Sequence, residues 1–187
     1  FPIRAGLLRR TVGEIQAVAG VSFDIRPGET LGLVGESGSG KSTVLNCISG
    51  LLTHWKGRIE IDSVRLTQAR NMAFYRKVQM VFQDPYSSLN PRKTIAAILS
   101  EPVVIHKLAH GKAAVENRII QLLEQVGLDR DALNLYPHQF SGGQRQRIGV
   151  ARAIALNPRL IVCDEPVSAL DVSIQSQIIN LLLELQR

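Results

Sequence analysis

The stretch GESGSGKST, residues 35–43, restricts the possible folds of this chain more than any other feature. It follows the apolar run LGLVG (31–35), so the order predicts a buried strand, a glycine-rich loop and a helix over 41–51. Glycines let such a loop wrap with its N–H groups pointing inward, and the helix adds the positive end of its dipole. The stretch therefore predicts a phosphate-binding loop. The alternative is an ordinary Gly/Ser turn before a helix.

The loop contains the candidate ligands of a nucleotide phosphate. Lys41 has the length to reach the β- and γ-phosphates, and the hydroxyl of Ser42 is a Mg²⁺ ligand at this position of the motif. ATP and Mg²⁺ are therefore the predicted ligands. The residues expected to surround the phosphates are Gly35, Glu36, Ser37, Gly38, Ser39, Gly40, Lys41, Ser42 and Thr43.

A second chemical feature is the acidic end of the apolar run LIVCDEP, residues 160–166. Ligands of open α/β sheets bind at the carboxyl ends of strands, which is where Asp164 and Glu165 fall. Asp164 is predicted to hold Mg²⁺ through water, and Glu165 to accept a proton from an attacking water. The alternative is an acid pair that caps the next helix. Cys163 has no partner base in the sequence, which favours a small core residue.

The rest of the chain alternates strand and helix patterns at both ends around a helical block. Strands are predicted for 18–25 (a pair), 57–61, 78–82 and the 160–166 run, and helices for 112–126 (closed by Gly127), 143–156 and 172–186. This order predicts an α/β core with parallel strands, a helical lobe within 85–136 and a small β lobe. The net charge of +6 is dispersed, so no nucleic-acid partner is expected. Cys47 and Cys163 lack CxxC spacing, which favours a cytosolic protein.

The stretch FSGGQRQR, residues 140–147, places two glycines where a helical pattern resumes. Glycine is costly inside a helix, but it permits a tight turn or a close approach to a ligand. A serine hydroxyl and two glycine N–H groups at a helix start form an anion-binding site. The stretch therefore predicts a second phosphate-seeking site. The alternative is a tight helix cap.

In the order GESGSGKST, VFQDP, FSGGQRQR, LIVCDEP and SALD, the chain resembles the nucleotide-binding domain of ABC-type ATPases over nearly its whole length. The resemblance implies an α/β fold: a P-loop NTPase (RecA-like) core with a parallel sheet, an antiparallel β subdomain and an inserted helical subdomain. It implies one domain over 1–187 that is incomplete at both ends. Its expected parts are about 1–83 (β subdomain and P-loop part of the core), 84–156 (helical subdomain) and 157–187 (rest of the core).

The resemblance also implies roles for residues outside the phosphate loop. Gln83 would bind Mg²⁺ beside Ser42 and Asp164, and would act in catalysis with Glu165. Because one chain carries two phosphate-seeking sites separated by a helical lobe, the domain is expected to form a head-to-tail dimer with ATP between the chains. The partner is a second ATPase subunit, identical or different. The nucleotide contacts expected across that dimer are Ser141, Gly142, Gly143, Gln144 and Asp171; Phe140 stands where leucine is commoner.

The stretch VFQDPYSSLNPR, residues 81–92, is similar to the same loop in importer ATPases for dipeptides, oligopeptides, nickel and glutathione. This similarity implies contact with membrane permease subunits around Gln83, near Asp84, Pro85 and Tyr86, and a cytoplasmic position on the inner face of the membrane. The alternative for this stretch is a surface loop without a partner. Two other functions stay open: a soluble ABC ATPase acting on nucleic acid or ribosomes, and a nucleotide-binding fragment with little activity.

Two family features lack a clear match. The four histidines, His54, His106, His110 and His138, all precede SALD, whereas the family carries a switch histidine after the final helix. The 187-residue chain is therefore expected to bind Mg-ATP but to hydrolyse it slowly. The aromatic residue that stacks on adenine in the family has only Phe1 as a candidate. The transported solute is not specified by this sequence.

Overall fold

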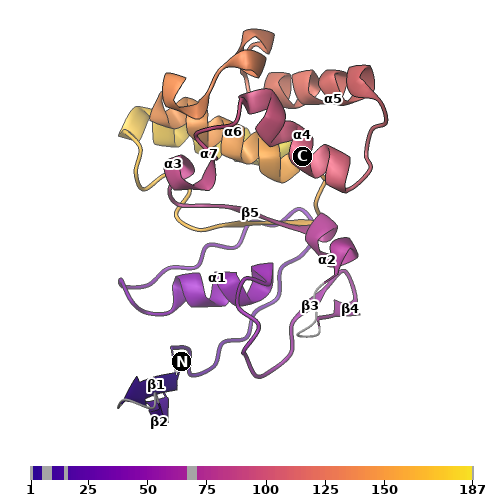
Figure 1. Ribbon diagram of the computed structural model, residues 1–187. Coiled ribbons are helices and arrows are strands. Elements are labelled where there is room, and N and C mark those ends of the chain that lie inside the picture. The colour runs from indigo at the N-terminus through magenta and orange to yellow at the C-terminus, as the bar shows by residue number, and fades with distance from the viewer. Residues whose placement is uncertain (1, 6–9, 15–16, 67–70, 187) are drawn as a thin grey trace. The chain divides into compact units, whose positions relative to one another are not determined.

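The computed structural model describes residues 2–5, 10–14, 17–66 and 71–186 of the 187-residue chain. It contains two compact units, residues 1–56 and 57–187, and each is described by itself (Figure 1). Phe1, the candidate for adenine stacking, lies outside the described residues. The division into three parts expected from the sequence stays a prediction.

The first unit holds an antiparallel strand pair and one helix. Strand β1 (Pro2–Ala5) pairs with β2 (Arg10–Glu14), and the helix α1 (Lys41–Ser49) follows the glycine-rich loop. Gly40 precedes α1 with a φ of 95°, and Gly50 ends it with a φ of 82°. Both values lie in the left-handed region that glycine adopts without steric cost. The predicted helix over 41–51 is confirmed to within two residues.

The strands predicted for 18–25 and 31–35 are wrong. Residues 17–40 form turns and irregular backbone, and the side chain of Val34 is 95% exposed. A strand is stable only when a neighbouring strand pairs with its N–H and C=O groups. Within the described part of this unit, the strand pairing is that of β1 with β2. An apolar run such as LGLVG indicates a preference for burial, but it does not supply a pairing partner.

The second unit contains a short hairpin and a parallel strand pair. Strand β3 (Glu60–Ile61) pairs with β4 (Val64–Arg65), so only the last two residues of the predicted strand 57–61 are correct. Strand β5 (Val78–Val81) pairs in parallel with β6 (Leu160–Cys163), in a register that sets Val78 opposite Leu160 and Val81 opposite Cys163. The predicted parallel pair is confirmed. Its register brings the residues after Val81 and Cys163 to one edge.

Four helices of the second unit begin at short polar side chains that accept backbone hydrogen bonds. Asn71, Asp84, Thr94 and Ser141 each cap the helix that follows, which stabilises the unpaired N–H groups of its first turn. The predicted helical composition of this region is confirmed. The helices are α2 (Met72–Lys77), α3 (Pro85–Ser88), α4 (Ile95–Ile105), α5 (Lys112–Gln125), α6 (Gly142–Ile154) and α7 (Val172–Gln186), with 3₁₀ turns η1 (Arg130–Asn134) and η2 (Pro137–Gln139).

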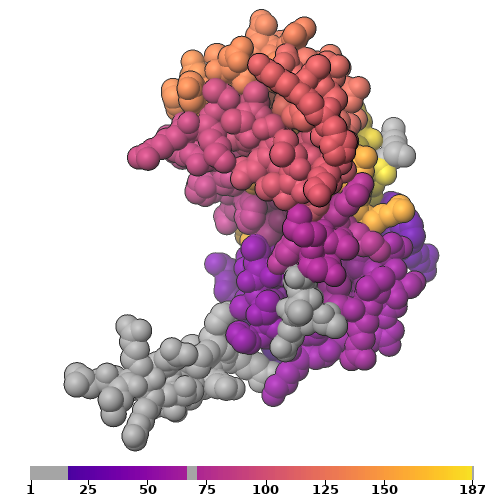
Figure 2. Space-filling model, turned by 45° about the vertical axis from the view of Figure 1, so that its right-hand side comes forward, coloured from indigo at the N-terminus to yellow at the C-terminus, as the bar shows by residue number. Residues whose placement is uncertain are grey.

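The core of this unit lies among α4, α5, α6 and α7 and against β5. Leu99, Leu122 and Ile148 are fully buried there, with Val81 at the sheet side. Figure 1 shows these four helices gathered next to the β5–β6 pair, and Figure 2 shows the magenta and orange residues of the helical region in continuous contact. None of the helices in the described ranges has the length and apolar character needed to cross a membrane.

Candidate functional site

The glycine-rich loop of the first unit closes on the side chain of the lysine that follows it. The ammonium group of Lys41 donates to the carbonyl oxygens of Gly35 at 2.7 Å and of Glu36 at 2.8 Å. The N–H group of Ser39 donates to the Glu36 carbonyl at 3.2 Å. The start of the loop, at Gly35 and Glu36, is thus held by the Lys41 ammonium group. Anionic oxygens would compete with these carbonyls for Lys41.

Two glycines of the loop both have a positive φ, but only one of them lacks the space for a side chain. Gly38 has a φ of 79° and Gly40 has a φ of 95°, a region that disfavours side chains. A Cβ atom on Gly40 would lie 2.7 Å from the carbonyl oxygen of Ala17 and 3.0 Å from Val18 Cγ2, whereas a Cβ on Gly38 would meet nothing within 4 Å. Gly40 is therefore required both for its conformation and for its space.

The two residues predicted to act in catalysis lie together in the second unit. The Gln83 amide nitrogen donates to Glu165 Oε2 at 3.0 Å, although the two are 82 positions apart in sequence. Each follows one strand of the β5–β6 pair, so the parallel register explains why they meet. Glu165 has a φ of 44°, a left-handed conformation that non-glycine residues seldom adopt and that is concentrated at functional sites.

Ser168 completes this cluster. Its hydroxyl donates to the Glu165 carbonyl at 3.1 Å, and its oxygen lies 3.4 Å from the Gln83 amide nitrogen. The sequence interpretation assigned Ser168 only to the SALD match, and no sequence signal indicated these two contacts.

Asp164 extends the parallel pair by one residue, because its N–H group donates to the Val81 carbonyl at 3.1 Å. Its half-buried side chain is therefore held at the carboxyl end of β6, where the sequence predicted a metal-binding acid. Burial raises the pKa of the preceding Cys163 thiol to about 11. A thiol with that pKa stays protonated at neutral pH, in agreement with its interpretation as a core residue.

The FSGGQRQR stretch begins α6 with a reciprocal cap. Ser141 Oγ accepts from the Gln144 N–H at 3.3 Å, and Gln144 Oε1 accepts from the Ser141 N–H at 2.9 Å. The helix cap considered as an alternative is thus present. It is compatible with anion binding, because a hydroxyl that accepts one hydrogen bond still has its own hydrogen to donate. The first-turn N–H groups of a helix also have no partner within the helix.

The paired glycines allow a close approach within the chain itself. A Cβ atom on Gly143 would lie 2.6 Å from Ile174 Cγ2, and one on Gly142 would lie 3.3 Å from Leu170 Cδ2. The start of α6 therefore packs directly on the segment that contains SALD and the first turn of α7. The sequence predicted that a ligand approaches these glycines and missed this packing.

Gly143→Ala is expected to lower the free energy of unfolding by about 1–3 kcal/mol, because the added methyl group overpacks against the stiff β-branched Ile174. Gly149→Ala, a control in the same helix with nothing within 4 Å of the added atom, should instead raise it by about 0.5–1 kcal/mol. Urea unfolding followed by circular dichroism measures both. Ile174→Ala should reduce the cost of Gly143→Ala, because it removes the clashing atom; equal effects of the two glycine substitutions would contradict the packing.

Three arginines of α6 bind backbone carbonyls. Arg145 Nε donates to Pro137 at 2.8 Å, Arg147 Nη1 to Val126 at 2.7 Å and Arg152 Nη1 to Ser88 at 2.6 Å. The sequence motifs did not predict these contacts of the three arginines with the backbone of their own chain. Arg145 and Arg152 are seven residues apart and therefore lie on one face of the helix, a spacing that could have indicated a shared contact surface.

Two of these arginines, Arg145 and Arg152, hold the segment that carries Gln83 on α6. The Arg145 guanidinium lies 4.7 Å from the centre of the Tyr86 ring, and that of Arg152 lies 6.0 Å from the centre of the Phe82 ring, both favourable cation–π distances. Burial lowers the pKa of Arg152. The hydrogen bond from the Tyr86 N–H to the Asp84 carboxylate lowers the pKa of that acid and caps α3.

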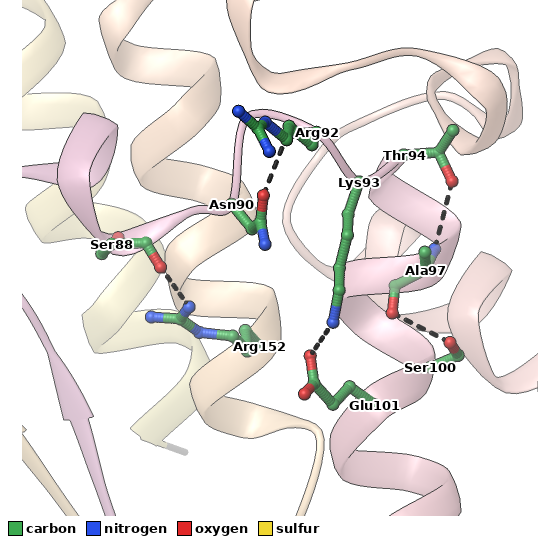
Figure 3. A network of polar contacts seen from close by, with 9 residues as sticks. All are labelled: Ser88, Asn90, Arg92, Lys93, Thr94, Ala97, Ser100, Glu101 and Arg152. Carbon is green, nitrogen blue, oxygen red and sulfur yellow. Dashed lines mark hydrogen bonds and ion pairs between the residues drawn. The ribbon is translucent and has the colours of Figure 1, made fainter.

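The exit from this segment is also fixed by polar contacts. Figure 3 shows Arg152 reaching the Ser88 carbonyl and the turn that follows leading into α4. Lys93 and Glu101 form an ion pair with Nζ and Oε2 3.1 Å apart, and the Thr94 hydroxyl caps α4 by accepting from the Ala97 N–H at 3.3 Å. The segment between Gln83 and α4 is therefore fixed by Arg152 at Ser88, and by the ion pair and the helix cap where α4 begins.

The fold and these sites define a phosphate-binding α/β protein of the P-loop class. A family model described as ABC transporter matches residues 18–168, and the chain belongs to this family. Over its whole length the chain is 52% identical to the glutathione import ATP-binding protein GsiA of Pectobacterium atrosepticum and 54% identical to that of Escherichia coli (strain K12). It spans only 30% of the length of each.

Solved structures agree with this assignment. The chain is similar to a dimeric post-hydrolysis state of the ATP-binding cassette MJ0796 bound to ADP and Pi, with 33% identity, a TM-score of 0.79 and coverage of 91% of this chain and 75% of that one. It is also similar to cbiO1 from Clostridium perfringens, part of the ABC transporter complex cbiONQ, with 26% identity, a TM-score of 0.78 and coverage of 99% and 71%. The resemblance stated from the motifs and the predicted P-loop NTPase fold are confirmed. The site residues stay predictions.

Proposed function

We propose that this chain is the ATP-binding and ATP-hydrolysing domain of an ABC importer for glutathione or peptides, and that it works in a head-to-tail pair. The observation that carries the proposal is the hydrogen bond of 3.0 Å between Gln83 and Glu165. It joins the two residues predicted to act in catalysis, at the carboxyl edge of the parallel strands where α/β proteins bind ligands. The names of the related proteins support the class of cargo.

The chain's own residues would divide the work of hydrolysis. The Lys41 ammonium and the N–H groups of the loop bind the β- and γ-phosphates. The Glu165 carboxylate accepts a proton from the water that attacks the γ-phosphate. One of its oxygens already accepts from Gln83, and a carboxylate has further lone pairs for a water hydrogen.

Mg²⁺ fits the donor set that the sequence predicted for it. The Ser42 hydroxyl, the Gln83 amide oxygen and the Asp164 carboxylate are hard oxygen ligands of the kind that Mg²⁺ prefers. A carboxylate can only accept hydrogen bonds, so the Gln83 amide must turn its nitrogen to Glu165 and its oxygen away from it. When bound, Mg²⁺ neutralises charge on the phosphate oxygens.

The pairing of two domains is supported by the capped start of α6. The Ser141 hydroxyl keeps a hydrogen to donate, and the first-turn N–H groups point out of the helix, which together suit the γ-phosphate of ATP bound by another copy. The dimeric state of the MJ0796 structure supports a pairing of two such domains. Gln144 would hold the cap, and Asp171 would lie at the crossing between the two copies.

Mixing two inactive variants tests the pairing. Lys41→Ala removes the phosphate cation, and Ser141→Asp keeps the helix cap while it places a negative charge against the phosphate. Each variant alone should hydrolyse ATP poorly, because every site in its dimer has one defect. An equal mixture should recover about a quarter of wild-type turnover, since about half the dimers are mixed and each has one intact site.

Steady-state phosphate release measures the recovery. Ser141→Asn, which keeps a cap without the charge, separates loss of the cap from electrostatic repulsion. A mixture no more active than the average of its two components would contradict the head-to-tail pair.

The membrane setting is part of the same proposal. The domain would lie on the cytoplasmic face of the membrane and contact permease subunits through the segment around Gln83 and α3. Tyr86 supports this assignment, because its ring is 56% exposed although Arg145 stacks on it. Slow turnover by the 187-residue chain alone stays a prediction.

A further inference from the structure

We propose that Ser168 is a positioning residue that orients both Glu165 and the Gln83 amide for ATP hydrolysis. The inference rests on the proposed function, because it concerns the same reaction. It starts from one juxtaposition: the Ser168 hydroxyl lies between the Glu165 carbonyl at 3.1 Å and the Gln83 amide nitrogen at 3.4 Å. No other residue described in this unit contacts both catalytic residues through one hydroxyl.

The first contact holds Glu165 in an unfavourable backbone conformation. A φ of 44° costs free energy for a residue with a side chain, and such residues persist only where their surroundings fix them. Both the N–H group of Ser168, at 3.2 Å, and its hydroxyl donate to the Glu165 carbonyl. The turn from Glu165 to Ser168 is therefore closed twice through the same oxygen.

The second contact determines how the Gln83 amide is turned. The hydrogen of the Ser168 hydroxyl is used by the Glu165 carbonyl, so the Ser168 oxygen can only accept from Gln83. Glu165 Oε2 also only accepts. With an acceptor for each of its two hydrogens, the NH₂ group faces this cluster, and the opposite atom, Gln83 Oε1, is presented to metal or water.

Loss of the Ser168 hydroxyl would therefore leave every reacting group in place but less well oriented. One amide hydrogen of Gln83 would lose its acceptor, and the Glu165 turn would lose one of its two donors. The Lys41 ammonium group, which is proposed to bind the phosphates, bonds to the carbonyls of Gly35 and Glu36 in its own loop. Turnover should fall, while the affinity for ATP should stay close to that of the wild type.

The test is steady-state ATP hydrolysis by the complete gene product at varied ATP and Mg²⁺. Ser168→Ala should lower kcat about 3- to 10-fold, the range expected for one hydrogen bond, with KM for ATP changed less than about 2-fold. The Mg²⁺ concentration for half-maximal activity should rise, because the Gln83 amide keeps only its hydrogen bond to Glu165 and its oxygen is less firmly oriented. Ser168→Thr keeps the hydroxyl and should recover most of the lost turnover. In a Gln83→Ala background, Ser168→Ala should cause a smaller loss of kcat than in the wild type, because only its contact with the Glu165 carbonyl is then left to lose.

Ser176→Ala is the matched control, because it removes an exposed serine hydroxyl of α7 that bonds to the Val172 carbonyl at 3.4 Å. It should keep wild-type turnover. Wild-type kcat in Ser168→Ala, or an undiminished further loss in the Gln83→Ala background, would overturn the inference. Glu165→Gln, assayed in parallel, separates the two proposals: if it keeps full turnover the proposed function fails, and if only Ser168→Ala does, the inference alone fails.

Discussion

Glu165→Gln is expected to lower ATP turnover by about 100- to 1,000-fold while ATP binding is retained, because a glutamine cannot accept the proton of the attacking water. The amide has nearly the shape of the carboxylate, and its oxygen can still accept from Gln83 as Glu165 Oε2 does at 3.0 Å. The variant should therefore fold normally and hold unhydrolysed ATP. Paired domains should accumulate in ATP, since the reaction that separates them is blocked.

Phosphate release measures the loss of ATP turnover, and light scattering measures the accumulation of paired domains in ATP. Glu124→Gln, which neutralises an exposed acid on α5, is the charge-matched control and should leave turnover unchanged. Glu165→Asp keeps a proton acceptor but shortens the side chain, so intermediate turnover is expected. Turnover close to that of the wild type in Glu165→Gln would assign the base to another residue.

Gly40→Ala is expected to lower nucleotide affinity at least about 100-fold. Its Cβ atom would lie 2.7 Å from the Ala17 carbonyl oxygen and 3.0 Å from Val18 Cγ2, and a φ of 95° is itself unfavourable for alanine. Because the closest atom belongs to the backbone, no side-chain rotation relieves the clash. The loop must therefore move at the residue directly before Lys41, and misplacing the phosphate ligands by about 1 Å is enough to lose most of their contribution.

Gly38→Ala separates the steric clash of an added Cβ atom from the conformational cost of a positive φ. Gly38 has a φ of 79°, but a Cβ atom there would meet nothing within 4 Å, so only the conformational cost applies. That cost is about 1–2 kcal/mol, or about 5- to 30-fold in affinity if it falls entirely on the bound form. Isothermal titration with ADP and ATP compares the two variants. Equal losses would show that conformation alone, without the close approach to Ala17, determines the loop.

An apolar run predicted as a strand was correct only where the structure supplies a neighbouring strand that pairs with it. VQMV and LIVC were predicted from their apolar character, and they pair in the parallel sheet as β5 and β6. LGLVG is just as apolar, yet the structure describes it as irregular and partly exposed. Composition measures the tendency of a segment to be buried, whereas a strand also needs a neighbour in register, which a single sequence does not contain.

In the candidate site, too, the features that depend on local sequence could be predicted and those that depend on distant residues could not. Residue types and spacing predicted Lys41 and Glu165, and the family resemblance implied Gln83 and Ser141, because each belongs to a local pattern. The contacts that orient these residues join distant positions: Gln83 and Ser168 are 85 apart, and Arg152 and Ser88 are 64 apart. Local patterns carry no information on such pairs, so the role of Ser168 emerged only from the structure.

The arginine contacts make α6 a rigid connection between α3, which Arg152 holds at Ser88, and the proposed phosphate contact at Ser141. The helix has 13 residues and is therefore about 20 Å long; one end carries the Ser141 cap, and the other holds Ser88 through Arg152. Ser141 and Arg152 are eleven residues apart, so a rotation of about 5° around Arg152 displaces Ser141 by about 1.4 Å, by the geometry of a lever about 16 Å long. A hydrogen bond tolerates about 0.5 Å. A slight push on α3 would thus decide whether the Ser141 hydroxyl is within reach of a phosphate oxygen.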